Sequence, residues 1–466
     1  MNYLKKTKII ATLGPASDKE KIIKELILEG VNVFRFNLKH NNVFWHNQRI
    51  KRVQKIANIL KTNVGILIDL QGPEIRIDTK NKQIISVKKG DEIIIGSSFS
   101  FEKTQIAILN KAVFDVLKKG DNLLIDDGFI EMKIIKKEKE LIIAKVIQGG
   151  KIKNKKGLNI PGKKINLSSL IEQDIKRLDM IAKSKVDFIA LSFARSKKDI
   201  DILKKEIEKR KINAQIVAKI ECQEALDNID ELISVSDAIM IARGDLGIEV
   251  PIEQLAFWQK NIIKKCRLNR KPVIVATQML HSMINNPRPT RAEAIDVAGA
   301  VFDKTDAVML SEETAAGNFP LRAVQAMSKI LLFNEEKTSF EDFQLKPYNV
   351  VELIASSVFS LVEKQSLLNI KKVIVFTESG YTANVMASFR SKAEIIAITN
   401  NQKTAEILSL SFGIQPVFTP LGFSENKIFD FLKKENLIKE NEIIALVHGK
   451  QKKRPKIFNS FSLTKV

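Results

Sequence analysis

Two short apolar runs, QIVAKIE at residues 215–221 and AIMIARG at residues 238–244, show most directly how this chain is built. Neither run alternates apolar with polar residues, and such continuous runs are typical of parallel strands that are covered on both faces. The residues between the two runs are sufficient for one helix, which a parallel connection needs. The pair therefore predicts a strand–helix–strand unit.

Six further runs of the same kind occur along the chain, and amphipathic segments such as KEKIIKELILEG (19–30) and KKDIDILKKEIEKR (197–210) lie between runs. The six runs are KIIATLG (8–14), VNVFRFN (31–37), VGILIDL (64–70), DFIALSF (187–193), VIVATQM (273–279) and AVMLSEE (307–313). Eight βα units in series predict an α/β protein built on a (β/α)8 TIM barrel, in which outer helices enclose a closed parallel sheet.

The barrel pattern is interrupted once and gives way to another pattern near the C-terminus. Residues 72–162 contain short alternating runs such as DEIIIG and ELIIAKVI, which predict an inserted, small β-barrel lid domain. From residue 336, strands such as VIVFT and EIIAITN alternate with helical segments and predict a C-terminal α/β domain with a mainly parallel sheet. We therefore expect a catalytic barrel at 1–71 and 163–335, the lid at 72–162, and an effector or oligomerisation domain at 336–466.

The chain is strongly basic, with 76 Lys and Arg residues against 54 Asp and Glu residues and a formal net charge of +22. The basic residues fall in many short clusters, and aromatic residues make up only 6% of the sequence, which is not typical of a nucleic-acid surface. We interpret the charge as steering anionic small substrates toward the protein. Nucleic-acid binding stays open as the less favoured alternative.

The sequence shows no signal that would direct it to a membrane or out of the cell. Its first residues, MNYLKKTKIIATLGPAS, are basic but lack the long apolar core of a secretory signal, and no apolar run is long enough to span a bilayer. The two cysteines, Cys222 and Cys266, fit a reducing compartment better than a disulfide framework. We expect a cytoplasmic protein without a membrane partner.

Polar side chains stand at the carboxyl ends of the predicted strands, where barrel enzymes hold their active sites. They are Arg35, Asn37, Asp69, Ser192, Lys219, Glu221, Arg243, Asp245, Thr277, Ser311 and Glu313. A barrel could carry a few such residues by chance. Their presence at seven successive strand ends predicts that they converge on one site.

Lys219 and Glu221 are the most informative of these residues. Alternate residues of a strand face the same way, so both side chains point toward the mouth of the barrel. An ammonium beside a carboxylate that binds Mg²⁺ suits the charge of a migrating phosphoryl group. Asp245 follows the next strand and would supply a second carboxylate for one Mg²⁺, while Gly244 allows close approach of a substrate carboxylate. An ordinary structural ion pair is the alternative for Lys219 and Glu221.

Several ordered motifs make the chain resemble the pyruvate kinase family, in its bacterial form without an extra C-terminal extension. They are TKIIATLGPAS, GVNVFRFN, DLQGPEIR, NKKGLNIPG, DFIALSF, IVAKIE, MIARGDLGIE, VIVATQML, NNPRPTRAE and TDAVMLSEETAAG. The resemblance as a whole extends from Lys6 to about residue 400. The resemblance implies Mg²⁺-dependent transfer of a phosphoryl group from phosphoenolpyruvate to ADP, which gives pyruvate and ATP in the last step of glycolysis. It also implies a homotetramer.

The resemblance assigns roles in binding phosphoenolpyruvate and in the chemistry. Arg35 and Lys219 would contact the transferred phosphoryl group, and Gly244, Asp245 and Thr277 would bind the carboxylate end of the substrate. Glu221 and Asp245 would hold one Mg²⁺, while a second Mg²⁺ arrives with the nucleotide. Thr277 and Ser311 resemble parts of the path that protonates the enolate, although a threonine hydroxyl is too weak an acid to be the ultimate donor.

The resemblance also assigns residues to the nucleotide and to the lid. Asn37, His40, Arg76 and Lys156 match nucleotide-phosphate contacts of the family. Asp127, in the run IDDG, resembles a lid carboxylate that closes toward the site. For Lys156, residue type alone would favour an ordinary solvated turn lysine, and only the motif favours a nucleotide contact.

One departure from the family falls in its K⁺ site, where this chain has Lys39 in place of the usual serine. The other K⁺ ligands match Asn37, Asp69 and the backbone at Leu70. We hypothesise that the Lys39 ammonium replaces K⁺ by pairing with Glu74 or Asp69, so that K⁺ becomes dispensable. The alternative is that Lys39 extends into solvent and K⁺ still binds.

A second departure lies in the C-terminal domain. The run TESGYT at 377–382 joins a strand to a helix start and matches the loop that binds a sugar-phosphate effector in many relatives, with Thr377, Ser379 and Thr382 as candidate contacts. Tyr381 stands where a basic residue is common, and the last loop, HGKQKKRPKIFNSF, lacks the glycine-rich pattern of responsive relatives. Regulation by a sugar phosphate stays open, with a purely structural turn as the alternative.

Two other functions compete with the kinase. Another Mg²⁺-dependent barrel enzyme acting through an enolate would share the metal carboxylates but would need neither the lid nor Arg76 and Lys156. A catalytically silent nucleotide- or RNA-binding relative would not need the complete set of catalytic residues. The presence of that set favours the kinase.

Overall fold

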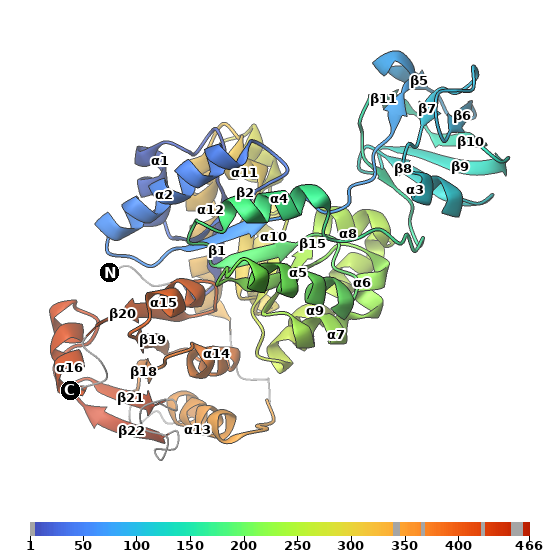
Figure 1. Cartoon of the computed structure of the whole chain (residues 1–466). Coiled ribbons are helices and arrows are strands. Elements are labelled where there is room, and N and C mark those ends of the chain that lie inside the picture. The colour runs from blue at the N-terminus through green and yellow to red at the C-terminus, as the bar shows by residue number, and fades with distance from the viewer. Residues whose placement is uncertain (1–4, 339–344, 365–368, 421–424, 449–459) are drawn as a thin grey trace.

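The computed structural model describes residues 5–338, 345–364, 369–420, 425–448 and 460–466. Figure 1 shows a central barrel, with a β-rich domain and an α/β domain on different sides of it. Within the described residues, no helix is both long and apolar enough to cross a membrane.

The central barrel is a closed sheet of eight parallel strands in the order β1-β17-β16-β15-β14-β13-β3-β2. The strands are β1 (Lys8–Thr12), β2 (Val31–Asn37), β3 (Gly65–Asp69), β13 (Phe188–Leu191), β14 (Gln215–Ile220), β15 (Ala238–Ala242), β16 (Val273–Ala276) and β17 (Ala307–Leu310). Each lies within one of the eight apolar runs, so the TIM-barrel prediction is confirmed.

Helices and short 3-10 turns surround the barrel (Figure 1). They are α1 (Glu20–Leu28), α2 (Val43–Ile59), α4 (Glu172–Ile181), α5 (Lys197–Lys209), α6 (Gln223–Asp227), α7 (Ile229–Val235), α8 (Arg243–Glu249), η2 (Ile252–Gln254), α9 (Leu255–Leu268), η3 (His281–Ile284), α10 (Arg291–Phe302), α11 (Glu312–Ala315) and α12 (Pro320–Lys337). Helix α10 begins with a capping box in which Thr290 and Glu293 each bond the other's backbone N–H.

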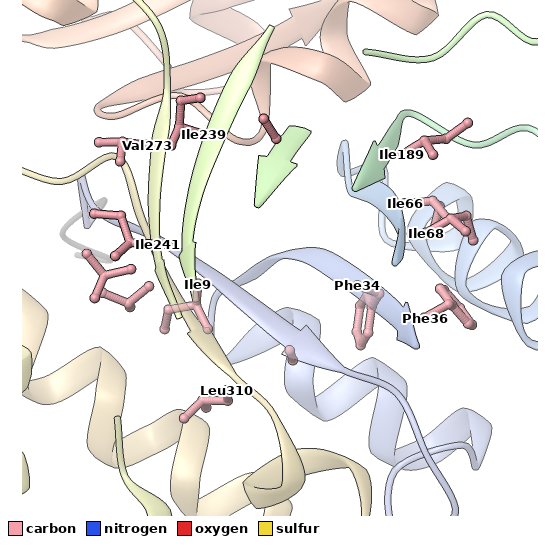
Figure 2. Packing of buried hydrophobic residues seen from close by; sticks show 14 of the residues in the cluster. Ile9, Phe34, Phe36, Ile66, Ile68, Ile189, Ile239, Ile241, Val273 and Leu310 are labelled. Atoms are coloured by element: carbon pink, nitrogen blue, oxygen red, sulfur yellow. The ribbon is translucent and has the colours of Figure 1, made fainter. Parts of the chain in front are cut away.

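Alternation along the strands separates two layers of core. Outward-facing residues such as Ile239 and Ile241 pack against the helices, while Met240 between them faces the barrel interior. Figure 2 shows part of the outer layer, with Phe34 and Phe36 of β2 in it. Both layers are fully buried, which explains why the strands are apolar throughout.

The domain inserted between β3 and α4 is β-rich, as predicted. Its main sheet has seven strands in the order β12-β8-β9-β10-β6-β7-β4, and β11 pairs separately with β5. Its elements are β4 (Asp78–Thr79), η1 (Lys80–Lys82), β5 (Ile85–Val87), β6 (Glu92–Gly96), β7 (Ile106–Ala107), α3 (Lys111–Val116), β8 (Asn122–Ile125), β9 (Ile130–Lys137), β10 (Leu141–Gln148), β11 (Gly150–Ile152) and β12 (Leu158–Asn159). Its side chains form a hydrophobic cluster distinct from that of the barrel.

The C-terminal α/β domain contains a five-stranded sheet in the order β20-β19-β18-β21-β22, in which only β22 is antiparallel. The mainly parallel sheet was predicted. The elements are α13 (Val350–Lys364), β18 (Lys372–Phe376), α14 (Tyr381–Ser388), β19 (Glu394–Thr399), α15 (Gln402–Leu408), β20 (Ile414–Phe418), α16 (Glu425–Lys434), β21 (Ile443–His448) and β22 (Ser460–Lys465). Most of the last predicted loop, residues 449–459, lies outside the described residues.

The C-terminal domain closes the amino-terminal end of the barrel. Leu410 packs into the barrel's interior cluster with residues such as Met240, and Ile407 packs beside it. The guanidinium of Arg390 lies 2.7 Å from the carboxylate of Asp306, immediately before β17, and both side chains are almost fully buried. This junction leaves the opposite, carboxyl end of the strands free for chemistry.

We expect Arg390→Met to destabilise the protein because it leaves the buried Asp306 carboxylate without its cation. Asp306 keeps backbone N–H bonds from Val273 and Phe412, so the loss should be about 3 kcal/mol, the lower end for a broken buried pair. Chemical denaturation followed by circular dichroism measures it. The matched control, Arg49→Met, removes a more exposed pair with Asp18 and should cost less than about 1 kcal/mol. Equal losses would contradict the argument.

Candidate active site

The carboxyl ends of the barrel strands bring together several of the residues that the sequence singled out. Lys219, on β14, lies at the centre: its ammonium is 2.8 Å from Glu221, 3.2 Å from Asp69 and 2.7 Å from the Ser192 hydroxyl. Burial opposes its charge, but the carboxylates of Asp69, Glu221 and Asp245 outweigh burial and raise the pKa of Lys219. The lysine is therefore a permanent cation at neutral pH.

Arg35, near the end of β2, is the second buried cation of the site. It donates through Nε to Asp69 at 2.8 Å and through Nη1 to the Thr12 hydroxyl at 3.0 Å. Burial would raise the pKa of Asp69, but Lys219 and Arg35 reverse that effect and lower it. Asp69 thus fixes both cations side by side, which is suitable for binding a multiply charged anion.

Glu221 and Asp245 are the two carboxylates predicted to hold Mg²⁺. Glu221 is fully buried, and its Oε2 accepts a hydrogen bond from the Phe193 N–H at 2.7 Å. Burial and the nearby Glu221 charge raise the pKa of Asp245 to about 7. Two oxygen ligands whose mutual repulsion a cation would relieve fit a hard divalent ion. Within the described residues, no group of three or more His, Cys, Asp or Glu side chains could hold a metal, so the other ligands would be substrate and water.

The turn after β16 holds Thr277 in an unusual backbone conformation. Its φ is +70°, in the left-handed region that β-branched residues avoid, and such strain costs about 1–3 kcal/mol. The Thr277 hydroxyl accepts a hydrogen bond from the Gly244 N–H at 2.7 Å and donates one to the Ala276 carbonyl at 2.6 Å. The structure therefore brings together Gly244 and Thr277, as the sequence analysis expected.

Ser311 lies at the end of the neighbouring strand, β17, and is held through its backbone. Its N–H donates to Glu313 at 2.7 Å, and the other oxygen of Glu313 accepts the Leu280 N–H at 3.3 Å. Glu313 is buried. It thus joins the loops that follow β16 and β17.

The predicted nucleotide contacts divide between the barrel and the lid. Arg76 donates to Glu74 at 2.8 Å at the entry to the lid, and Lys156 pairs with Asp126 of the lid at 2.6 Å. Asn37 is the last residue of β2, and His40 follows that strand on the barrel. Burial and the neighbouring Lys39 lower the pKa of His40. Arg76 and Lys156 thus each form an ion pair with an acidic residue of this chain.

A cavity of about 280 Å³ lies between the barrel and the lid. Its lining includes Lys39, Glu74 and Asp245 together with the lid residues Asp127 and Leu158. Asp127, like Asp126 before it, has a φ of +56°. Asp127, the predicted lid carboxylate, and Asp245, a predicted Mg²⁺ ligand, thus line the same cavity.

Lys39 forms an ion pair with Glu74 at 3.1 Å, and Glu74 in turn binds Arg76. Asp69, the other partner that the sequence left open, is already engaged by Arg35 and Lys219. The carbonyl of Leu70, a predicted K⁺ ligand, accepts a hydrogen bond from Ser192 at 2.7 Å.

The predicted effector loop, residues 377–382, begins directly after β18 and ends in the first turn of α14. The Gly380 N–H donates to the Thr377 hydroxyl at 3.0 Å, and Gly380 has a φ of +86°. Tyr381 is half exposed, and its hydroxyl accepts a bond from Asn349 at 3.1 Å. Ser379 lies in the turn before α14, and Thr382, in the first turn of that helix, is buried.

Sequence reasoning missed the residues that hold the site together. Thr12 supports Arg35, although only its place in the ATLG run at the end of the first strand could have drawn attention to it. Ser192, Arg243 and Glu313 were noted as strand-end residues without a role. Arg243 donates to the Thr277 carbonyl at 2.8 Å, a contact that no spacing in the sequence reveals.

Comparison with known proteins agrees with this geometry. The family model "Pyruvate kinase, barrel domain" matches residues 4–324, and "Pyruvate kinase, alpha/beta domain" matches residues 352–463. Pyruvate kinases of Staphylococcus aureus (strain MRSA252) and Staphylococcus epidermidis are 40% and 39% identical over 424 residues, covering 89% of this chain and 72% of each relative. A crystal structure of a pyruvate kinase from Cryptosporidium parvum is similar with a TM-score of 0.92 and 32% identity, covering 99% of this chain and 96% of that one. The chain belongs to the pyruvate kinase family.

Proposed function

We propose that this protein transfers the phosphoryl group of phosphoenolpyruvate to ADP and releases pyruvate and ATP. The observation that carries the proposal is the pair of buried cations, Lys219 and Arg35, fixed by Asp69 next to the carboxylate of Glu221. Two fixed cations complement the charge that spreads over a phosphoryl group in transit. They face a pair of carboxylates suited to Mg²⁺.

The substrate carboxylate would bind near Gly244, Asp245 and Thr277. The phosphoryl group would then lie against Arg35 and Lys219, whose positions change little during transfer because both are buried and ion-paired. A Mg²⁺ held by Glu221 and Asp245 would supply positive charge to the substrate oxygens. Once the phosphoryl group leaves, Thr277 and Ser311 would form part of the hydroxyl path that delivers a proton to the enolate carbon.

ADP would bind with its own Mg²⁺, between Asn37 and His40 on the barrel and Arg76 and Lys156 toward the lid. Both lid-side cations have acidic partners now, so nucleotide phosphates would compete with Glu74 and Asp126 for them. The cavity between the domains gives the lid room to move toward the barrel, which would bring Asp127 closer to Asp245.

The direct test is pyruvate release from phosphoenolpyruvate and ADP with Mg²⁺. We expect turnover that requires all three components. No turnover, together with salt-sensitive RNA binding, would instead support the silent nucleotide- or RNA-binding relative.

We further propose that Lys39 makes K⁺ dispensable. The support is its ion pair with Glu74 at 3.1 Å. The backbone N–H of Lys39 also donates to the side chain of Asn37, one of the residues that match the family's K⁺ ligands, at 3.1 Å. The charge that K⁺ would supply is then built into the chain, although the pair is partly exposed and therefore weak by itself.

We expect equal turnover of the parent protein in K⁺ and in tetramethylammonium salts, because neither cation is needed. Lys39→Ser should lower turnover in tetramethylammonium at least about tenfold, a cost of one lost charge interaction, and K⁺ should restore it. Steady-state rates at matched ionic strength measure both effects. Lys55→Ser is the control, because it removes an exposed lysine of α2 that pairs with Glu20 of α1. A parent protein that needs K⁺ would contradict the role of Lys39.

The proposed oligomer is a homotetramer in the cytoplasm. Large apolar side chains on α9 and α10 support self-association, because Phe257, Ile295 and Phe302 are each more than half exposed. Light scattering after size exclusion measures the assembly. Regulation through the 377–382 loop stays a prediction.

A further inference from the structure

The turn after β16 is a strained part of the proposed site. Thr277 has a φ of +70° and Gln278, the next residue, a φ of +55°. A β-branched residue adopts this conformation only where its surroundings impose it, and such strain is concentrated at functional sites. The contacts that impose it are therefore of functional interest.

Arg243 makes the contacts that hold this turn. Its Nη2 donates to the Thr277 carbonyl at 2.8 Å and contacts the Met279 sulfur at 2.8 Å. The next residue, Gly244, donates its N–H to the Thr277 hydroxyl at 2.7 Å. The first two residues of α8 thus bind both the backbone and the side chain of Thr277.

Arg243 is itself anchored on the side away from the turn. Its Nη1 donates to Asp296 of α10 at 2.7 Å and to Gln259 of α9 at 3.4 Å. Its side chain is only 9% exposed. A planar guanidinium can serve the turn and these two helices at once, whereas a lysine ammonium on a flexible stem cannot reproduce that geometry.

We propose that Arg243 is a positioning residue that holds Thr277 in its strained conformation and so aims the Thr277 hydroxyl at the substrate. The proposal rests on the proposed function, in which Thr277 acts through that hydroxyl. This role explains why a buried arginine lies at the end of a barrel strand. The contacts of Arg243 described above are with the turn after β16 and with α9 and α10. A purely structural arginine would stabilise the fold without acting through Thr277.

A double-mutant cycle separates these two roles. We expect Arg243→Lys to lower kcat about 10- to 100-fold, as for a small misplacement of a catalytic group, with less than about a threefold change in the KM for phosphoenolpyruvate. In a Thr277→Ala background the same substitution should lower kcat less than about threefold, because the hydroxyl that it misplaces is already absent. Equal factors in the two backgrounds, or an unchanged kcat in the Arg243→Lys protein, would overturn the proposal.

Two further variants keep the test decisive. Asp296→Asn removes the charge of the anchor behind Arg243 but keeps an acceptor oxygen there. It should therefore lower kcat in the same direction by a smaller factor, which gives a second cycle if Arg243→Lys does not fold. Arg49→Lys, at an ion pair on α2, is the matched control and should leave kcat unchanged. Full activity of the Asp296→Asn protein would count against the proposal. So would an Arg243→Lys protein with the same kcat as the Arg49→Lys control.

A structural readout separates this inference from the proposed function. Crystals of the Arg243→Lys or Asp296→Asn protein should show Thr277 with a negative φ. If the parent protein released no pyruvate, only the proposed function would fail, and the φ of Thr277 in the variants would still decide the role of Arg243. A Thr277 that keeps its positive φ in both variants would overturn it.

Discussion

Replacing Lys219 with methionine is expected to lower kcat by about three to five orders of magnitude, the range for removing a cation that stabilises a transferring phosphoryl group. Lys219 is buried among Asp69, Glu221 and Ser192, and methionine keeps most of its volume but none of its charge. The KM for phosphoenolpyruvate should change far less, because Arg35 still binds the phosphoryl group of the ground state. Coupled assays of pyruvate release measure both constants.

The Lys219→Met protein also lacks the positive charge that Glu221 and Asp69 contact in the parent, so its folding must be checked. Circular dichroism and the thermal midpoint should show a folded barrel, since Asp69 keeps its pair with Arg35. Lys55→Met, on the outer face of α2, serves as the control and should retain full activity. A folded Lys219→Met protein that retained more than about one hundredth of the parent activity would contradict the role assigned to Lys219.

Glu221→Gln is expected to have the second largest effect, an increase of at least about 100-fold in the Mg²⁺ concentration needed for half-maximal activity. Glu221 and Asp245 are the two carboxylates that the site offers to the ion. Glutamine keeps the shape and can still accept the Phe193 N–H, but it loses the charge that a hard cation requires. Saturating Mg²⁺ should restore part of the turnover.

Binding of Mn²⁺, followed by electron paramagnetic resonance in the absence of substrates, gives an independent measure of the same site. The parent protein should bind one ion that Glu221→Gln binds at least about 100-fold more weakly. Glu208→Gln, on the exposed face of α5, should bind the ion like the parent. Equal Mn²⁺ affinity in the Glu221→Gln protein would remove Glu221 from the metal site.

The barrel could be predicted because its strands are buried on both faces, which leaves an unmistakable pattern of continuous apolar runs. The proximity of Lys219 and Glu221 could be predicted from the two-residue period of a strand. Both predictions depend only on local sequence patterns and on the closure of the barrel. The same logic explains why the strand-end residues were found as a set.

The sequence could not say how those residues are held. Lys39 had two acidic candidates, and Glu74 is its partner because Asp69 is saturated by Arg35 and Lys219. The positive φ of Thr277 is equally hidden, since nothing in the residue type suggests it. Such features depend on contacts between distant segments, which a local pattern does not encode.

The way the C-terminal domain closes the barrel has a consequence for how the protein is made. Lys6 donates to the carbonyls of Ser391 and Lys392, and Lys8 donates to the carbonyl of Ile414. The first strand, β1, also pairs with the last barrel strand, β17. During synthesis, Lys6, Lys8 and β1 therefore cannot complete these contacts until the residues up to Ile414 have left the ribosome. Until β17 is made, the edge of β1 that does not pair with β2 is an exposed apolar edge. Chaperones that shield such edges should therefore matter more for the yield than the stability of the finished fold.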